Sequence, residues 1–106
     1  MCGIGLLFSP HKNTPTRNSI SEKMAQSILH RGPDGGGIWT NEEQNISIFH
    51  RLLAILDSTS TGNQPMVSPS KNWTISFNGE IYNYTHLRKE LLAAGSQFNG
   101  HSDTEV

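Results

Sequence analysis

The residue whose chemistry stands out is Cys2, the only cysteine in the chain, which directly follows the initiator Met1. If Met1 is removed, as the small side chain of Cys2 should permit, one residue carries both a thiol and a free α-amino group. In model peptides an α-amine has a pKa of about 7.7–8.0, so near neutral pH part of it can accept a proton. Such an amine can activate its own thiol without a histidine. The alternative is that Cys2 is an inert, small apolar residue, as most lone cysteines are.

Charged side chains in two further stretches are candidates for contact with a ligand. Arg31 and Asp34 stand in residues 30–37, where a proline and three consecutive glycines indicate a loop and exclude a helix. That loop is either a flexible turn or a segment that packs closely over a site. Arg51 stands near the end of an apolar strand, where it either extends into solvent or is held rigidly to bind a carboxylate through its planar guanidinium.

Composition and charge exclude several classes of protein. With 106 residues the chain is one domain at most. Its net charge is −1 and its charged residues are scattered along the chain, so neither a nucleic-acid-binding nor a membrane-binding surface is indicated. One cysteine cannot form an internal disulfide, and no charged-then-apolar leader opens the chain. The five histidines show no metal-ligand spacing, so we expect no metal site. We expect a cytoplasmic location.

The spacing of apolar residues predicts the first elements. Residues 4–8 are a short buried strand, residues 11–18 a polar loop, and residues 20–29 an amphipathic helix that begins with the capping-box pattern of Ser19 and Glu22. Residues 38–40 and 45–53 form a hairpin around a polar turn.

The second half alternates loops with shorter elements. Residues 57–69 are a loop, residues 73–77 a strand that ends at Asn78-Gly79, and residues 84–94 a helix that stops at Gly95. Residues 102–105 resemble the first turn of another helix. The order strand, helix, hairpin, strand, helix predicts an α+β fold with both helices against one face of a sheet.

Six stretches in this order resemble a known family, although none of them alone is specific. Together they strongly resemble the N-terminal glutaminase domain of class II glutamine amidotransferases of the asparagine synthetase type, which are N-terminal-nucleophile hydrolases. The resemblance spans essentially the whole chain, and the Arg-Gly-Pro-Asp form favours the asparagine synthetase branch. The stretches are Met1 to Ile4, His30 to Gly35, His50 to Leu52, Gly62 to Met66, Phe77 to Asn83 and Ser102 to Glu105.

The resemblance implies a reaction and its catalytic residues. Cys2 would attack the side-chain amide of glutamine with its own α-amine as base, form a γ-glutamyl thioester and release ammonia. The side-chain amide of Asn78 and the backbone N–H of Gly79 would stabilise the oxyanion, a role often worth about 2.7–4 kcal/mol per donor.

The resemblance also assigns the residues that bind the amino-acid end of L-glutamine. Arg51 would pair with the α-carboxylate, Asp103 would hold the α-ammonium, and Glu80 would lie beside the same end together with Asn78 and Gly79. For Arg31 and Asp34 it implies only that they shape the loop near the nucleophile.

In fold, the resemblance implies an α/β/β/α sandwich of the N-terminal-nucleophile type. Residues 1–106 would be about its first half, a partial glutamine amidotransferase type 2 domain without its C-terminal side. The synthetase domain that would use the ammonia, with ATP and Mg²⁺, would be a further part of the same full-length chain, and this segment itself would need no cofactor. A homodimer is compatible with this reading. The segment alone is expected to be poorly stable and weakly active or inactive.

Three functional hypotheses follow. The first is glutamine hydrolysis that supplies ammonia to aspartate for asparagine synthesis or, alternatively, to a sugar or other acceptor in surface polysaccharide synthesis. The second is a glutamine-binding fragment without turnover, in which binding would survive Cys2→Ala. The third is a structural domain whose cysteine is incidental. The combination of Cys2, Arg51, Asn78, Gly79 and Asp103 argues against the third, because a protein core does not need it.

Overall fold

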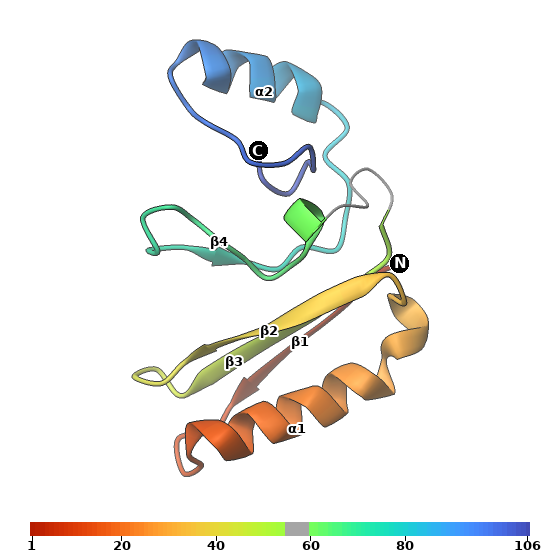
Figure 1. Ribbon diagram of the computed structural model, residues 1–106, viewed down its shortest axis with the longest axis vertical. Helices are drawn as coiled ribbons and strands as arrows, with labels where there is room; N and C mark the ends of the chain where they lie inside the picture. The colour runs from red at the N-terminus through yellow and green to blue at the C-terminus, as the bar shows by residue number, and fades with distance from the viewer. Residues whose placement is uncertain (55–59) are drawn as a thin grey trace.

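Two groups of elements, stacked along the longest direction of the molecule, make up the chain (Figure 1). A computed structural model describes residues 1–54 and 60–106. In chain order the elements are β1 (Gly3–Phe8), α1 (Thr14–Ser27), the 3₁₀ turn η1 (Leu29–Arg31), β2 (Gly35–Asn41), β3 (Ile46–Leu52), the 3₁₀ turn η2 (Ser60–Gly62), β4 (Met66–Val67), β5 (Thr74–Ile75) and α2 (Tyr84–Ala93).

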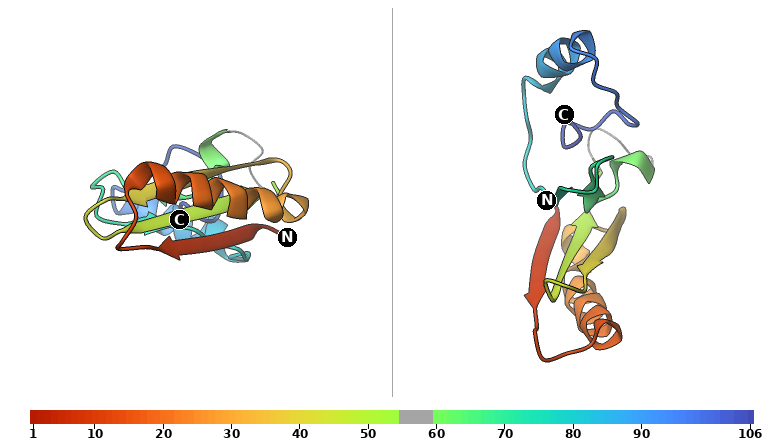
Figure 2. Two further views of the ribbon diagram at one scale, coloured as in Figure 1. Left: turned by 90° about the horizontal axis from the view of Figure 1, so that it is seen from below. Right: turned by 90° about the vertical axis from the view of Figure 1, so that its left-hand side faces the viewer.

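The first group is an antiparallel sheet of β1, β3 and β2, in that spatial order, with α1 across one face (Figure 2). The predicted first strand and the predicted hairpin of β2 and β3 are both present. The first strand is not buried as predicted, because Ile4, Leu6 and Phe8 are 41 %, 57 % and 61 % exposed. Phe49, on the central strand, is only 3 % exposed and lies between Gly5 of β1 and Ile38 of β2 in the ladder. A Cβ on Gly5 would stand 1.9 Å from Cζ of Phe49. A glycine at this position therefore gives the aromatic ring its place in the core.

Helix α1 begins earlier than the sequence predicted. Its first residue is Thr14, and its N-cap is Asn13, whose side chain accepts a hydrogen bond of 3.0 Å from the N–H of Thr16. The prediction of a loop over residues 11–18 is wrong from Thr14 on, as is the capping role given to Ser19. Pro15, which suggested a loop, stands in the first helical turn, where the missing N–H costs no hydrogen bond.

The glycines of residues 30–37 also differ from the prediction, because Gly35, Gly36 and Gly37 all belong to β2. Gly36 has a φ of 152°, which L side chains rarely adopt, and a Cβ there would lie 2.2 Å from the carbonyl oxygen of His50. Gly36 therefore allows a close approach of β2 to β3, whereas a Cβ on Gly35 or Gly37 would first meet Asn63 or Gln64. The irregular segment is limited to Gly32 to Asp34.

The second group begins with a short antiparallel pair, β4 and β5, over the sheet face that α1 leaves open (Figure 1). One cavity is lined by Leu6, Trp39 and Ile48 of the sheet, by Trp73 just before β5 and by Thr74 of β5. The predicted strand over residues 73–77 is present but shorter. The predicted loop over residues 57–69 contains η2 and β4, and its residues 57–59 lie outside the described part of the chain.

One buried hydrogen bond joins the two groups. His50 of β3 is fully buried, and its Nδ1 lies 2.8 Å from the hydroxyl of Ser76, just after β5. Burial lowers the pKa of His50 from 6.5 to about 4, because the charged imidazolium is poorly solvated there. The histidine is therefore neutral near pH 7.

Helix α2 is confirmed nearly as predicted, with Gly95 after it at a φ of 95°. Its position is not as predicted, because it lies beyond β4 and β5, on the opposite side of the sheet from α1 (Figure 1). The expectation that both helices cover one face is therefore wrong, and the layers run helix, sheet, short sheet, helix. None of the helices in the described ranges is long and apolar enough to cross a membrane.

Candidate active site

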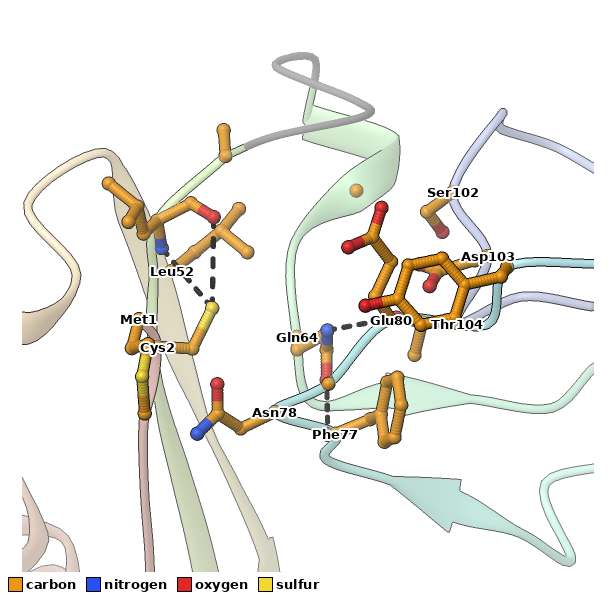
Figure 3. Close-up of a pocket in the computed structure, with 15 residues that line it drawn as sticks. Met1, Cys2, Leu52, Gln64, Phe77, Asn78, Glu80, Ser102, Asp103 and Thr104 are labelled. Atoms are coloured by element: carbon orange, nitrogen blue, oxygen red, sulfur yellow. Dashed lines mark hydrogen bonds between the residues drawn. The ribbon is translucent and has the colours of Figure 1, made fainter. Parts of the chain in front are cut away.

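The thiol of Cys2 is held against the end of β3, although the two residues are far apart in the sequence (Figure 3). Its Sγ accepts a hydrogen bond of 3.3 Å from the N–H of Leu53 and lies 3.7 Å from the carbonyl oxygen of the same residue. Pairing of β1 with β3 brings these groups together, since Gly3 is opposite Arg51 in the ladder. The two contacts with Leu53 hold the sulfur at a defined place beside the end of β3.

Arg31 and Asp34 hold the backbone on the two sides of this contact. Nε of Arg31 donates to the carbonyl oxygen of Cys2 at 3.1 Å. The carboxylate of Asp34 accepts from the N–H of Ala54 at 2.9 Å, and the N–H of Asp34 donates to the carbonyl of Leu52 at 3.0 Å. Both side chains therefore position the segment around the sulfur, and neither lines the pocket described next.

A pocket of about 350 Å³ opens beside Cys2, between the end of the sheet and the C-terminal segment (Figure 3). This volume lies within the range of about 300–1,000 Å³ that is typical of small-molecule sites. Its wall combines apolar carbon with a few polar groups. The lining residues are Met1, Cys2, Leu52, Leu53, Ala54, Gly62, Gln64, Phe77, Asn78, Gly79, Glu80, Tyr82, Ser102, Asp103 and Thr104.

Most of the sequence-predicted site residues meet in this pocket. Cys2 stands on one wall, Glu80 and Asp103 stand on the facing wall, and the amide of Asn78 extends from the floor toward the cysteine side (Figure 3). Gly79 follows Asn78 in an irregular bend, where a Cβ would come within 2.5 Å of the ring of Phe77. Five predicted residues from three segments of the chain thus surround one space.

Asp103 is the buried acid of this group, at 7 % exposure. Its Oδ2 accepts a hydrogen bond of 2.7 Å from the N–H of Ile81, which fixes the carboxylate against the segment that carries Asn78. Residues 103–105 form a turn, in which the N–H of Val106 donates to the carbonyl of Asp103 at 3.3 Å. Glu80, in contrast, is exposed at the mouth of the pocket.

Arg51 is the predicted residue that the structure does not bring to the pocket wall. It lies on β3, half-buried, and its Nε donates to the carbonyl oxygen of Gly32 at 3.2 Å. Its pairing with a substrate carboxylate therefore stays a prediction.

Gln64 is a buried pocket residue to which the sequence pattern assigned no role. It is 5 % exposed, and its Oε1 accepts from the N–H of Phe77 at 2.6 Å while its Nε2 donates to the hydroxyl of Thr104 at 3.2 Å. The stretch Gly62 to Met66 was one of the six that carried the family resemblance, but a glutamine between a glycine and a proline does not indicate its partners.

In residues 1–54 and 60–106 no group of three or more histidine, cysteine, aspartate or glutamate side chains is placed to hold a metal ion.

Comparison with known families decides what this arrangement belongs to. A family model described as a glutamine amidotransferase domain matches residues 1–106, and so includes every residue of the pocket. The chain belongs to the glutamine amidotransferase domain family.

Relatives of this glutamine amidotransferase domain are much longer proteins. It is 42 % identical over 108 residues to "Asparagine synthetase [glutamine-hydrolyzing] 1" of Bacillus subtilis, covering all of this chain and 17 % of the relative. It is 37 % identical over 106 residues to "Asparagine synthetase [glutamine-hydrolyzing] 2" of Arabidopsis thaliana, covering all of this chain and 18 % of that protein. It is 30 % identical over 115 residues to "Amidase chry2" of Gibberella zeae, covering all of this chain and 17 % of that protein. The domain thus spans less than a fifth of these relatives, and no solved structure matches it with significance.

Proposed function

We propose that this domain hydrolyses the side-chain amide of L-glutamine, with Cys2 as the nucleophile, and releases ammonia. The observation that carries the proposal is a single pocket lined by the Cys2 thiol, by Asn78 and Gly79, and by the carboxylates of Glu80 and Asp103. The family match supports the same substrate.

The reaction requires that Met1 be removed, because only then does Cys2 have a free α-amine. That amine takes the thiol proton, Sγ attacks the δ-carbonyl carbon, and the C–N bond breaks as the proton passes to the departing ammonia. Water then cleaves the γ-glutamyl thioester, which yields glutamate and restores the thiol. In the unprocessed chain Met1 itself lines the pocket and is 73 % exposed, so it stands within reach of a processing enzyme.

Two kinds of hydrogen-bond donor would lower the barrier. The N–H of Leu53 donates to Sγ at 3.3 Å and holds the sulfur in place for attack. The amide of Asn78 and the N–H of Gly79 would receive the negative charge that develops on the substrate oxygen, each a contribution of about 2.7–4 kcal/mol. Since both kinds of donor belong to the folded protein, neither has to be reorganised during the reaction.

The facing wall supports recognition of an amino acid. Asp103 is buried and its orientation is fixed by Ile81, so it can bind an ammonium group without further ordering. Glu80 adds a second negative charge at the mouth. Arg51 would complete recognition by pairing with the α-carboxylate, which requires its guanidinium to reach the pocket that it does not line in this structure.

For the protein as a whole, the proposal is ammonia supply to an ATP- and Mg²⁺-dependent synthetase domain of the same chain, most simply to form asparagine from aspartate. The names of the two asparagine synthetase relatives support that acceptor. In this proposal residues 1–106 are the first half of an α/β/β/α sandwich, of which the observed layers are one part. A sugar or other acceptor is the alternative, since a relative of a different name shares the same domain.

The test is an intact-mass spectrum of the full natural chain before and after 6-diazo-5-oxo-L-norleucine, a glutamine mimic that alkylates activated cysteines. We expect loss of Met1, one adduct on Cys2 and ammonia release from glutamine. In Cys2→Ala the adduct should be absent and turnover should fall at least about 10³-fold. Retained Met1 without an adduct would exclude the mechanism and favour a glutamine-binding module instead.

A further inference from the structure

Three separate segments of the chain form the pocket wall that faces Cys2. They are residues 62–64, which begin at the last residue of η2, residues 77–82 after β5, and residues 102–104 near the C-terminus (Figure 3). Within the described residues none of these segments is a helix or part of a sheet, apart from Gly62 at the end of η2. Their relative positions therefore depend on side-chain hydrogen bonds and packing, and not on a backbone ladder.

Gln64 is the side chain that joins all three segments. It belongs to the first, its Oε1 accepts from the N–H of Phe77 in the second, and its Nε2 donates to the hydroxyl of Thr104 in the third. The orientation of the amide is not arbitrary. The N–H of Phe77 can only donate, so the carbonyl oxygen of Gln64 must face it, and the amino group is left for Thr104.

The two partners of Gln64 are the chain neighbours of the proposed functional groups. Phe77 precedes Asn78, whose amide would bind the oxyanion, and Thr104 follows Asp103, whose carboxylate would bind the α-ammonium. A second bond, from the N–H of Ile81 to Asp103, ties the same two segments from the other side. The distance between the oxyanion donor and the ammonium site is thus set by two bonds, one of which is made by a side chain that need not touch substrate.

We propose that Gln64 is a positioning residue that sets the spacing between the oxyanion donors and the ammonium-binding carboxylate, and thereby matches the pocket to the length of glutamine. This proposal rests on the proposed glutaminase function. Gln64 suits the role because it is only 5 % exposed, so water does not compete for its hydrogen bonds. A small displacement of catalytic donors can reduce a rate about 10²-fold.

The principal test is Gln64→Leu in the full natural chain, a change that keeps the approximate volume and removes both bonds. Two reagents separate positioning from general damage. Alkylation by 6-diazo-5-oxo-L-norleucine needs the whole site, whereas alkylation of Cys2 by iodoacetamide needs only an accessible thiolate. We expect the first rate constant, and kcat for glutamine, to fall about 10- to 100-fold, with the iodoacetamide rate within about twofold of wild type.

A second, milder variant keeps the proposal testable if Gln64→Leu does not fold. Thr104→Val removes only the bond on the ammonium side, so KM for glutamine should rise about three- to tenfold with little change in kcat. Thr104→Ser, which retains the hydroxyl, should restore KM. The matched control is Thr40→Val, which also removes a bonded hydroxyl, in this case one that pairs with Asn18 and Ser47 away from the pocket, and should leave both constants unchanged.

The outcomes separate this proposal from the proposed function. A wild-type chain that neither hydrolyses glutamine nor reacts with the mimic overturns both. An active wild type with an unchanged Gln64→Leu variant, or with equal losses for the two reagents, overturns the role of Gln64 alone. An unchanged KM for glutamine in Thr104→Val also overturns the role of Gln64 alone.

Discussion

The two ends of the molecule are built in different ways. Residues 1–54 form a three-stranded ladder covered by a helix, and they contain the buried apolar residues Ala25, Phe49 and Leu52. Residues 60–106 contain the 3₁₀ turn η2, a pair of two-residue strands and a helix in which no residue is buried. The pocket lies where the two ends meet, with Cys2 on the sheet side and Asn78, Glu80 and Asp103 on the other.

The comparison shows that the two walls of the pocket are held in place by different kinds of hydrogen bond. Cys2, the proposed nucleophile, depends on a continuous backbone ladder that begins at Gly3 and brings Cys2 beside the end of β3. The substrate wall depends on a few side-chain bonds, chiefly those of Gln64 and Asp103. A substitution in the first region should therefore act mainly on stability, and one in the second mainly on turnover.

The largest expected effect is on stability and concerns a substitution in residues 1–54. Phe49→Ala would leave a cavity beside Gly5 in the center of the sheet and should lower the free energy of unfolding by about 3–5 kcal/mol. Leu92→Ala is the control in the other region, since Leu92 is 49 % exposed on α2, and should have a much smaller effect. Chemical denaturation of both variants makes the comparison. Equal losses would show that the two regions are stabilised alike.

The next effect is on turnover. Asn78→Ala should lower kcat for glutamine about 10²–10³-fold through loss of an oxyanion donor, with little change in the melting temperature because the side chain is exposed. Asn83→Ala is a matched control, since Asn83 is also exposed and makes no side-chain cap bond to α2. Steady-state ammonia release measures both. A loss of stability equal in free energy to the loss of kcat would argue against a catalytic role.

The smallest expected effect concerns the hydrogen bond between His50 and Ser76, which joins the two regions. The pKa of His50 is lowered by burial from 6.5 to about 4, so the unfolded chain binds more protons than the folded one between these values. Stability is therefore complete above about pH 6.5 and falls as the pH drops toward 4. His50→Asn, which has no titrating ring, should show a shallower dependence when chemical denaturation is compared at pH 7 and pH 5. An identical pH dependence in both proteins would exclude His50 as its source.

The sequence predicted the elements better than their ends and partners. The strand at residues 4–8, the hairpin and the second helix follow from apolar spacing and from turn residues, which act locally. The start of α1 was missed because Pro15 is compatible with both a loop and a first helical turn, and the cap of Asn13 decides between them. The glycines of β2 were read as a loop because the close approach of His50 is a long-range contact.

For the candidate site the division is similar. The types and order of Cys2, Asn78, Gly79, Glu80 and Asp103 were visible in the sequence, and the family match agrees with the resemblance that they carry. That Arg51 bonds to Gly32, and that Gln64 links Phe77 to Thr104, could not be predicted, because each bond joins segments whose separation in space is set by the fold.

The sequence by itself determined the chemical groups, the family and most of the local elements, because these depend on residue types and short-range spacing. The tertiary structure alone decided which groups share a pocket, which backbone N–H faces the thiol, and which buried amide spans the facing wall. The physical reason is that hydrogen bonds and burial depend on distances between residues far apart in the chain, and only strand pairing and packing fix those distances.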